Sequence, residues 1–235
     1  MIVLGIETST PRTSVALGTE TEILASVQLT ARARQDSVVP SIQQLLAWTG
    51  LELSSVGGIA VGLGPGLFTG LRVGVEAGKS LAQVLHVPIV GIGSLDALAF
   101  TVRHTSRTIA AVIDARRSEV FYATYRSVPG GVVQLSEPRV APPDHLVADL
   151  QAVGSEVLLV GNGAILYRQH LEESSPRWEF ASAAWAHPMA QALVELAVPR
   201  FLREDHDRLF DVVPFYLRKS DAEIAWDQRR RGASA

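Results

Sequence analysis

Cysteine is absent from the 235-residue sequence. Its absence excludes disulfide bonds, thiolate zinc sites and cysteine nucleophiles together. A strong excess of basic charge is also missing, because the formal net charge is −3 at pH 7. Proteins that hold a nucleic acid by themselves usually present a basic surface. If this chain takes part in nucleic-acid chemistry, we expect another subunit to make the contact.

Signals for export or membrane insertion are lacking as well. The opening Met1-Ile-Val-Leu-Gly-Ile-Glu7 has no basic region before its apolar run and reaches a carboxylate too early for a signal peptide. The longest uncharged stretch, 56–71, contains six glycines and a proline, which does not fit a membrane span. We expect a cytoplasmic protein with no membrane partner.

The hydrophobic pattern predicts two halves of one topology. Each half begins with three successive strands and continues with helices and further strands, an order that makes a mixed sheet with helices on its faces. The predicted domains are 1–105 and 106–235, the second ending in a flexible basic tail at 227–235. The predicted strands lie at 2–7, 14–18, 23–29, 57–62, 88–92, 108–114, 119–125, 132–135 and 157–160, and the helices at 37–48, 70–85, 144–151 and 187–203.

A glycine-rich stretch, Gly62-Leu-Gly-Pro-Gly-Leu-Phe-Thr-Gly-Leu-Arg72, joins a predicted strand to a predicted helix. Glycine and proline are unfavourable inside regular elements, so the stretch is a shaped loop. Backbone N–H groups are free at such junctions, which bind phosphates or partners. Gly78-Lys79-Ser80 does not complete a P-loop, because position 73 is valine and Lys79 falls well inside the helix.

The helix after this loop has small residues at every fourth position: Gly70, Gly74, Gly78 and Ala82. Residues four apart share a helix face, so they form a ridge without side chains that another element can approach closely. That element is either a partner's helix or the chain's own sheet, and the spacing alone leaves both open. The preceding helix, 37–48, has a helical apolar period that includes Val38, Ile42 and Leu45.

Candidates for catalysis are weak. The six histidines are scattered and none forms an i, i+4 pair, while Glu204-Asp-His-Asp207 is most simply a solvated charged corner. Ser94 lacks the G-x-S-x-G setting of a nucleophile elbow and is interpreted as an N-cap, with Asp96 favouring the first turn of the helix. Metal-dependent hydrolysis and serine acyl transfer therefore have no support in the sequence.

Four motifs stand out along the chain: Ile6-Glu-Thr-Ser-Thr10, Gly64-Pro-Gly-Leu-Phe-Thr-Gly-Leu-Arg72, Ile113-Asp-Ala-Arg-Arg117 and Pro214-Phe-Tyr-Leu-Arg218. In order and spacing they resemble the TsaB (YeaZ) family. That bacterial family takes part in threonylcarbamoyladenosine synthesis on tRNA. The resemblance implies an α/β fold of the actin-like, sugar-kinase-like ATPase type, with two ribonuclease-H-like lobes.

The resemblance also implies a non-catalytic subunit. The catalytic paralogue TsaD holds its metal with an H-x-x-x-H pair, and the matching positions here are Ser94 and Leu98, which cannot replace imidazole. The family implies docking to TsaD, recruitment of the ATPase TsaE, a homodimer when alone, and tRNA contact only through the complex. ATP with Mg²⁺ and a metal are expected on partner subunits, with no cofactor on this chain. The expected partner-binding residues are Gly70, Gly74, Gly78, Ala82, Val38, Ile42 and Leu45.

The alternative function is that of a nucleotide-binding ATPase or phosphotransferase of the same fold. Its first phosphate loop would need an acidic residue to organise magnesium, and Glu7 would stand in for the usual aspartate. Two departures from the family pattern bear on these roles, Leu67 in place of a small serine and Arg34 in place of a histidine. The possible nucleotide-binding loop residues are Thr8, Ser9, Gly64, Pro65, Gly66, Gly161 and Gly163.

Overall fold

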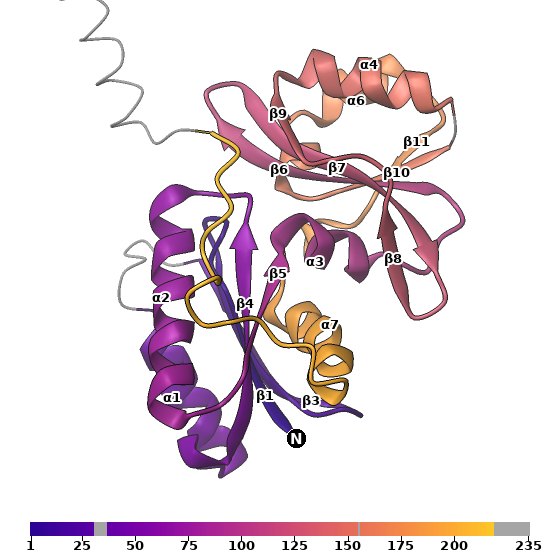
Figure 1. Ribbon diagram of the computed structural model, residues 1–235. Coiled ribbons are helices and arrows are strands. Elements are labelled where there is room, and N and C mark those ends of the chain that lie inside the picture. Colours follow the sequence, from indigo (N-terminus) through magenta and orange to yellow (C-terminus); the bar gives the residue numbers. More distant parts are fainter. Residues whose placement is uncertain (31–36, 155, 219–235) are drawn as a thin grey trace, which may run out of the picture.

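The computed structural model describes residues 1–30, 37–154 and 156–218. Arg34 and the predicted tail at 227–235 lie outside the described residues. Figure 1 shows two sheets, each with helices packed on its faces, and a C-terminal segment that crosses the first of them. We call residues 203–218 the strap. Within the described ranges, no helix combines the length and apolarity needed to cross a bilayer.

The first sheet has the strand order β3-β2-β1-β4-β5. β1 pairs antiparallel with β2, and β2 with β3, whereas β4 and β5 continue the sheet in parallel with β1. All five strands were predicted within one or two residues at their ends. Their bounds are β1 Ile2–Glu7, β2 Thr13–Gly18, β3 Ile23–Leu29, β4 Val56–Gly64 and β5 Ile89–Gly93.

The second sheet repeats this arrangement as β11-β10-β6-β7-β8, with β9 paired to the outer part of β7. Its first three strands are again antiparallel neighbours, and β10 and β11 again run parallel to β6. The duplicated order confirms the predicted fold class, two ribonuclease-H-like lobes of the actin-like type. The bounds are β6 Thr108–Arg116, β7 Glu119–Val128, β8 Gly131–Gln134, β9 Arg139–Ala141, β10 Val157–Val160 and β11 Trp178–Phe180.

Helices pack on both faces of each sheet. α1 and α2 cover one face of the first sheet, and α7 covers the other. α3 lies between the sheets and packs on both, while α4 and α6 cover the outer face of the second sheet. The bounds are α1 Val38–Thr49, α2 Phe68–Leu85, α3 Ser94–Thr101, α4 Pro143–Val153, α5 Asn162–Leu166, α6 Arg168–Ser174 and α7 Ala190–Leu202, with one-turn 3₁₀ segments at Leu53–Ser55 and Ala183–Trp185.

The predicted domain division needs one correction. The strands separate between β5 and β6, near the expected boundary at 105/106. However, α7 packs on the first sheet through Ala190, Leu193, Val194 and Ala197, although it was assigned to the second domain. The strap follows it, and its Val212 belongs to the core beneath α1 and α2. The first lobe is therefore built from both ends of the chain.

Local signals explain why the main helices end where they do. α1 ends at Gly50, which has φ of 67°, a left-handed conformation that glycine adopts without strain. α2 begins at Phe68, inside the glycine-rich stretch 62–72. No clear sequence pattern predicts β9, α6 and β11, which are only three to seven residues long. α5 occupies 162–166, where a loop had been expected from Gly161-Asn-Gly163.

Candidate functional site

The two loops expected to hold phosphate in the first lobe lie directly against each other. Leu67 donates its backbone N–H to the carbonyl oxygen of Ser9 at 2.7 Å. A Cβ atom added at Gly66 would lie 2.3 Å from that same oxygen, so only glycine fits the contact. Gly64 and Pro65 are joined by a cis peptide bond and are both buried. The two loops are therefore in direct contact at Ser9, Gly66 and Leu67.

Glu7, at the end of β1, points into the protein rather than towards a ligand. Its carboxylate accepts hydrogen bonds from the Ser9 backbone N–H at 2.6 Å and from the Ser94 hydroxyl at 2.9 Å. The side chain lies against Gly62, where an added Cβ would be 2.1 Å from Oε2. Burial raises the pKa of Glu7 above its usual 4.5, and the hydrogen bonds only partly oppose this shift. Glu7 therefore does not offer an exposed carboxylate to magnesium.

Ser94 is not the N-cap that the sequence suggested. Gly93 caps α3, and Ser94 is the first residue of the helix, fully buried. Its hydroxyl bridges two elements, because it donates to Glu7 and accepts from the Gly64 backbone N–H at 3.2 Å. Leu98, one turn later, is also fully buried and belongs to the core of the second lobe. Ser94 and Leu98 are thus both interior packing positions.

The second predicted phosphate loop is also closed. Gly161 has φ of 117°, and a Cβ there would lie 2.0 Å from the carbonyl oxygen of Val112 on β6. Gly163 packs on the same strand, where its Cβ would be 2.9 Å from a methyl group of Val112. Asn162, between them, accepts the Asp114 backbone N–H at 3.1 Å. The glycines serve the close approach of α5 to β6.

The glycine ridge of α2 faces the chain's own sheet, which is one of the two possibilities that the spacing left open, and not the partner that the family resemblance implied. A Cβ at Gly70 would lie 2.2 Å from the Thr8 carbonyl oxygen, and one at Gly74 would lie 2.2 Å from the Thr8 hydroxyl. At Gly78 the obstacle is a methyl group of Val61 on β4, again at 2.2 Å. Ala82 is 3% exposed and completes this buried face.

The expected partner-binding residues of α1 are likewise interior. Val38, Ile42 and Leu45 are at most 5% exposed and pack in the core between α1, α2 and the sheet. The apolar residues that do face solvent on these helices were missed. Val39 and Trp48 of α1 are 58% and 64% exposed, and Val84 of α2 is 74% exposed. In the sequence, Trp48 fitted the helical apolar period of 37–48, so its exposure could not be read from the pattern.

A small aromatic cluster attaches the strap to the start of α2. The rings of Phe68 and Tyr216 have centroids 4.6 Å apart, and the Arg72 guanidinium lies 4.1 Å from the Phe68 ring centre. Arg72 Nε also donates to the Tyr216 hydroxyl at 3.1 Å. Residues of the glycine-loop motif and of the Pro214–Arg218 motif are therefore in contact, although the two motifs lie far apart in the sequence.

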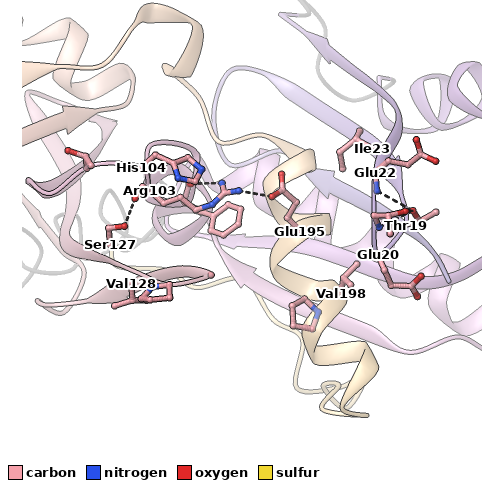
Figure 2. Close-up of a pocket in the computed structure, with 16 residues that line it drawn as sticks. Thr19, Glu20, Glu22, Ile23, Arg103, His104, Ser127, Val128, Glu195 and Val198 are labelled. Atoms are coloured by element: carbon pink, nitrogen blue, oxygen red, sulfur yellow. Dashed lines mark hydrogen bonds and ion pairs between the residues drawn. The ribbon is translucent and has the colours of Figure 1, made fainter.

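A hollow of about 950 Å³ lies elsewhere, between the lobes. Figure 2 shows Arg103 of the segment after α3 and Glu195 of α7 pointing towards each other across its middle, at 3.0 Å. The turn after β2 forms one side and the turn after β7 the other, where the Ser127 hydroxyl donates to the Arg103 carbonyl oxygen. None of the predicted site residues lines this hollow, and its central charges already neutralise each other.

The repeated strand order of the two sheets defines a protein of two ribonuclease-H-like lobes. A family model described as TsaD, tRNA N6-adenosine threonylcarbamoyltransferase, matches residues 24–226. The chain is 31% identical to the tRNA threonylcarbamoyladenosine biosynthesis protein TsaB of Haemophilus influenzae, covering 96% of each chain. It is 30% identical to TsaB of Bacillus subtilis, covering 98% of this chain and 100% of that one.

A solved structure agrees. YeaZ from Pseudomonas aeruginosa superposes with a TM-score of 0.76 at 28% identity, covering 92% of this chain and 99% of that one. The chain belongs to the TsaB (YeaZ) family of tRNA threonylcarbamoyladenosine biosynthesis proteins. The resemblance inferred from the four motifs is confirmed, and with it a role in this tRNA modification pathway.

Proposed function

We propose that this chain is a non-catalytic scaffold subunit that docks onto a TsaD-type transferase through the outward faces of α1 and α2. It supports the activity of the transferase and recruits the TsaE ATPase. The transferase handles both the threonylcarbamoyl-adenylate donor and the adenosine beside the tRNA anticodon. ATP with Mg²⁺ and the metal belong to the partners, and this chain contacts tRNA only through the complex.

The observation that carries this proposal is the exposed apolar surface of the α1/α2 layer. The inner faces of both helices are buried in the core. On their outer faces, Val39, Trp48 and Val84 are more than half exposed. Tryptophan is among the residues that most often dominate binding energy at protein interfaces. Both helices pack on the same face of the first sheet, so their outward residues lie on one side of the first lobe (Figure 1).

The interior of the site favours a scaffold over the ATPase alternative. Three backbone N–H groups of the first-lobe loops, those of Ser9, Gly64 and Leu67, already have acceptors within the chain. The acidic residue needed for magnesium, Glu7, is 1% exposed. A second copy of the chain would use the same α1/α2 surface, so we expect the homodimer and the complex with the transferase to compete.

Calorimetric titration of the full chain with the TsaD-type transferase of the same organism tests the proposal. Trp48→Glu and Val84→Glu should each weaken binding by at least about tenfold, because each places a charge in an apolar interface. Leu166→Glu is the matched control, since Leu166 is 59% exposed but lies on α5 of the other lobe. Its affinity should equal that of the wild type.

Two results would contradict the scaffold role. One is transfer of threonylcarbamoyl to tRNA by the purified chain alone, which would make it an enzyme. The other is tight binding of magnesium-ATP to the isolated chain, which would favour the ATPase alternative. Equal affinities of the two charged variants and the wild type would reject the α1/α2 surface but not the scaffold role itself.

A further inference from the structure

The strap is held at several points along its length and is not a loose end. Asp207 donates its backbone N–H to the carbonyl oxygen of Ile89 and accepts the Gly91 N–H at 2.7 Å on its carboxylate. Further on, Val212 is 1% exposed, and the Phe215 N–H donates to the Leu63 carbonyl oxygen at 2.7 Å. Figure 1 shows the strap running beside α2 across the first lobe.

Between its fixed points, the strap exposes a large aromatic side chain. Phe210 is 85% exposed, the highest value among the large apolar residues described. In a flexible segment, an exposed phenylalanine costs little free energy because the segment can move and bury the ring. Here the anchored residues on either side, Asp207 and Val212, hold Phe210 on the surface. Exposed aromatic residues on rigid elements are typical of interface anchors.

A hollow of about 730 Å³ lies between the strap and the end of α2. We call it the strap groove. Ala82, Gln83 and His86 form its helix side, and His206, Arg208 and Leu209 form its strap side. Val84, 74% exposed, lies on the same helical turn as Gln83 and His86. The groove is thus adjacent to the apolar α1/α2 surface.

In the part of the chain that the structure describes, the two charged groups that line the groove differ in their partners: Asp207 is paired, and Arg208 is not. Its one lining carboxylate, Asp207, is neutralised by Arg200, whose Nη2 lies 3.0 Å from Oδ1. Arg208 is exposed, and no carboxylate within residues 1–30, 37–154 and 156–218 forms an ion pair with it. A complementary occupant would bring an apolar side chain and a carboxylate of its own.

We propose that the strap groove receives an apolar segment bearing a carboxylate from the same transferase that docks on α1 and α2. Arg208, which lines the groove, is the charge partner, and Phe210, the residue after the lining Leu209, adds an apolar contact beside the groove. This inference rests on the proposed function, because the groove extends that docking surface through Val84. A protein suits the groove better than a nucleic acid, since Phe210 and Val84 present apolar surface and the chain's net charge is −3.

The test compares the affinities of Phe210→Ser and Arg208→Glu for the purified transferase by calorimetry. Each change should weaken binding by at least about tenfold, and only the effect of Arg208→Glu should shrink at high salt, because screening weakens charge pairs. Leu166→Ser and Arg126→Glu are matched controls, since both residues are exposed on the second lobe. Both controls should bind like the wild type.

The outcomes separate this inference from the proposed function. If the wild-type chain does not bind the transferase, the docking proposal itself fails. If the wild type binds and both strap variants bind equally well, the groove is not part of the interface. If the variants change only self-association in sedimentation experiments, the occupant is a second copy of this chain, and the assignment to the transferase is overturned.

Discussion

The Thr8 hydroxyl donates a hydrogen bond of 2.7 Å to the carbonyl oxygen of Gly70, so the first loop of the chain is fastened to the first turn of α2. Four residues later the same hydroxyl faces Gly74, where an added Cβ would lie only 2.2 Å away. The glycine spacing of α2 is therefore matched to the chain's own first loop. Because glycine has no side chain, the backbone of α2 can pack directly against Thr8 and Val61.

Gly74→Ala should destabilise the protein. Alanine favours helices by about 1 kcal/mol over glycine, but the clash with Thr8 outweighs this gain, and overpacking typically costs about 1–3 kcal/mol. Urea denaturation should show a lower midpoint than for the wild type. Ser80→Ala, on the exposed side of the same helix, is the control and should leave the midpoint unchanged or slightly higher.

A double-mutant cycle with Thr8→Ala identifies the cause of this loss. Removing the hydroxyl removes the atom nearest to the new Cβ, so Gly74→Ala should cost less in the Thr8→Ala background. An equal cost in both backgrounds would show that the contact with Thr8 is not responsible. If Gly74 and Gly78 faced a partner, as the family resemblance implied, bulky residues there would spare the fold and break only the partner contact. The contact with Thr8 predicts a loss of stability instead.

The strands and their succession along the chain were predictable because short apolar strands and their turns leave a strong local signal. All nine predicted strands are present. The direction of the glycine ridge was not, because spacing shows that Gly70, Gly74 and Gly78 share a face but not what covers it. The apolar residues beside these glycines did indicate the direction of the ridge. Leu71, Val75 and Ala82 occupy the same side of α2 and are all buried, as a core face requires.

The position of α7 could not be predicted for a different reason. Its apolar residues show that it packs on a sheet, but two sheets were available and sequence distance favoured the nearer one. The contacts of Ser94 were also out of reach. A serine before an acidic residue is typical of an N-cap, and only the fold reveals that Glu7, 87 residues away, accepts its hydroxyl.

Glu7 should give the stability a distinct pH dependence. Its pKa in the folded protein is raised above 4.5 by burial. Its protonated form therefore favours folding, and this contribution is lost as the pH rises through the folded-state pKa. The difference in unfolding free energy between the wild type and Glu7→Gln should thus shift against the wild type as the pH rises above 4.5 and through the raised folded-state pKa. Urea titrations at several pH values measure it, and a constant difference would show that Glu7 does not titrate in this range.

His187 should show the opposite dependence. Burial, assisted by the nearby Arg12, lowers the pKa of His187 from 6.5 to about 4, and its Nδ1 lies 3.0 Å from the Thr10 hydroxyl. The neutral ring favours folding above pH 6.5, and this contribution is lost as the pH falls towards 4. NMR titration of the ring protons should give the low pKa directly. Arg12→Met should raise it, whereas an unchanged value would assign the whole shift to burial.

Asp207 should control the attachment of the strap. Its carboxylate accepts the Gly91 N–H and pairs with Arg200, and hydrogen bonds to charged groups contribute about 1.5–3 kcal/mol when buried. Because the Asp207 side chain is 32% exposed, we expect Asp207→Ala to cost somewhat less, about 1–2 kcal/mol. Hydrogen exchange should accelerate at the Gly91 amide and along the strap. Asp205→Ala is the matched control, since Asp205 pairs with the same arginine at 3.2 Å but is 60% exposed. If both variants exchange alike, the strap is held by its apolar contacts and not by the Asp207 carboxylate.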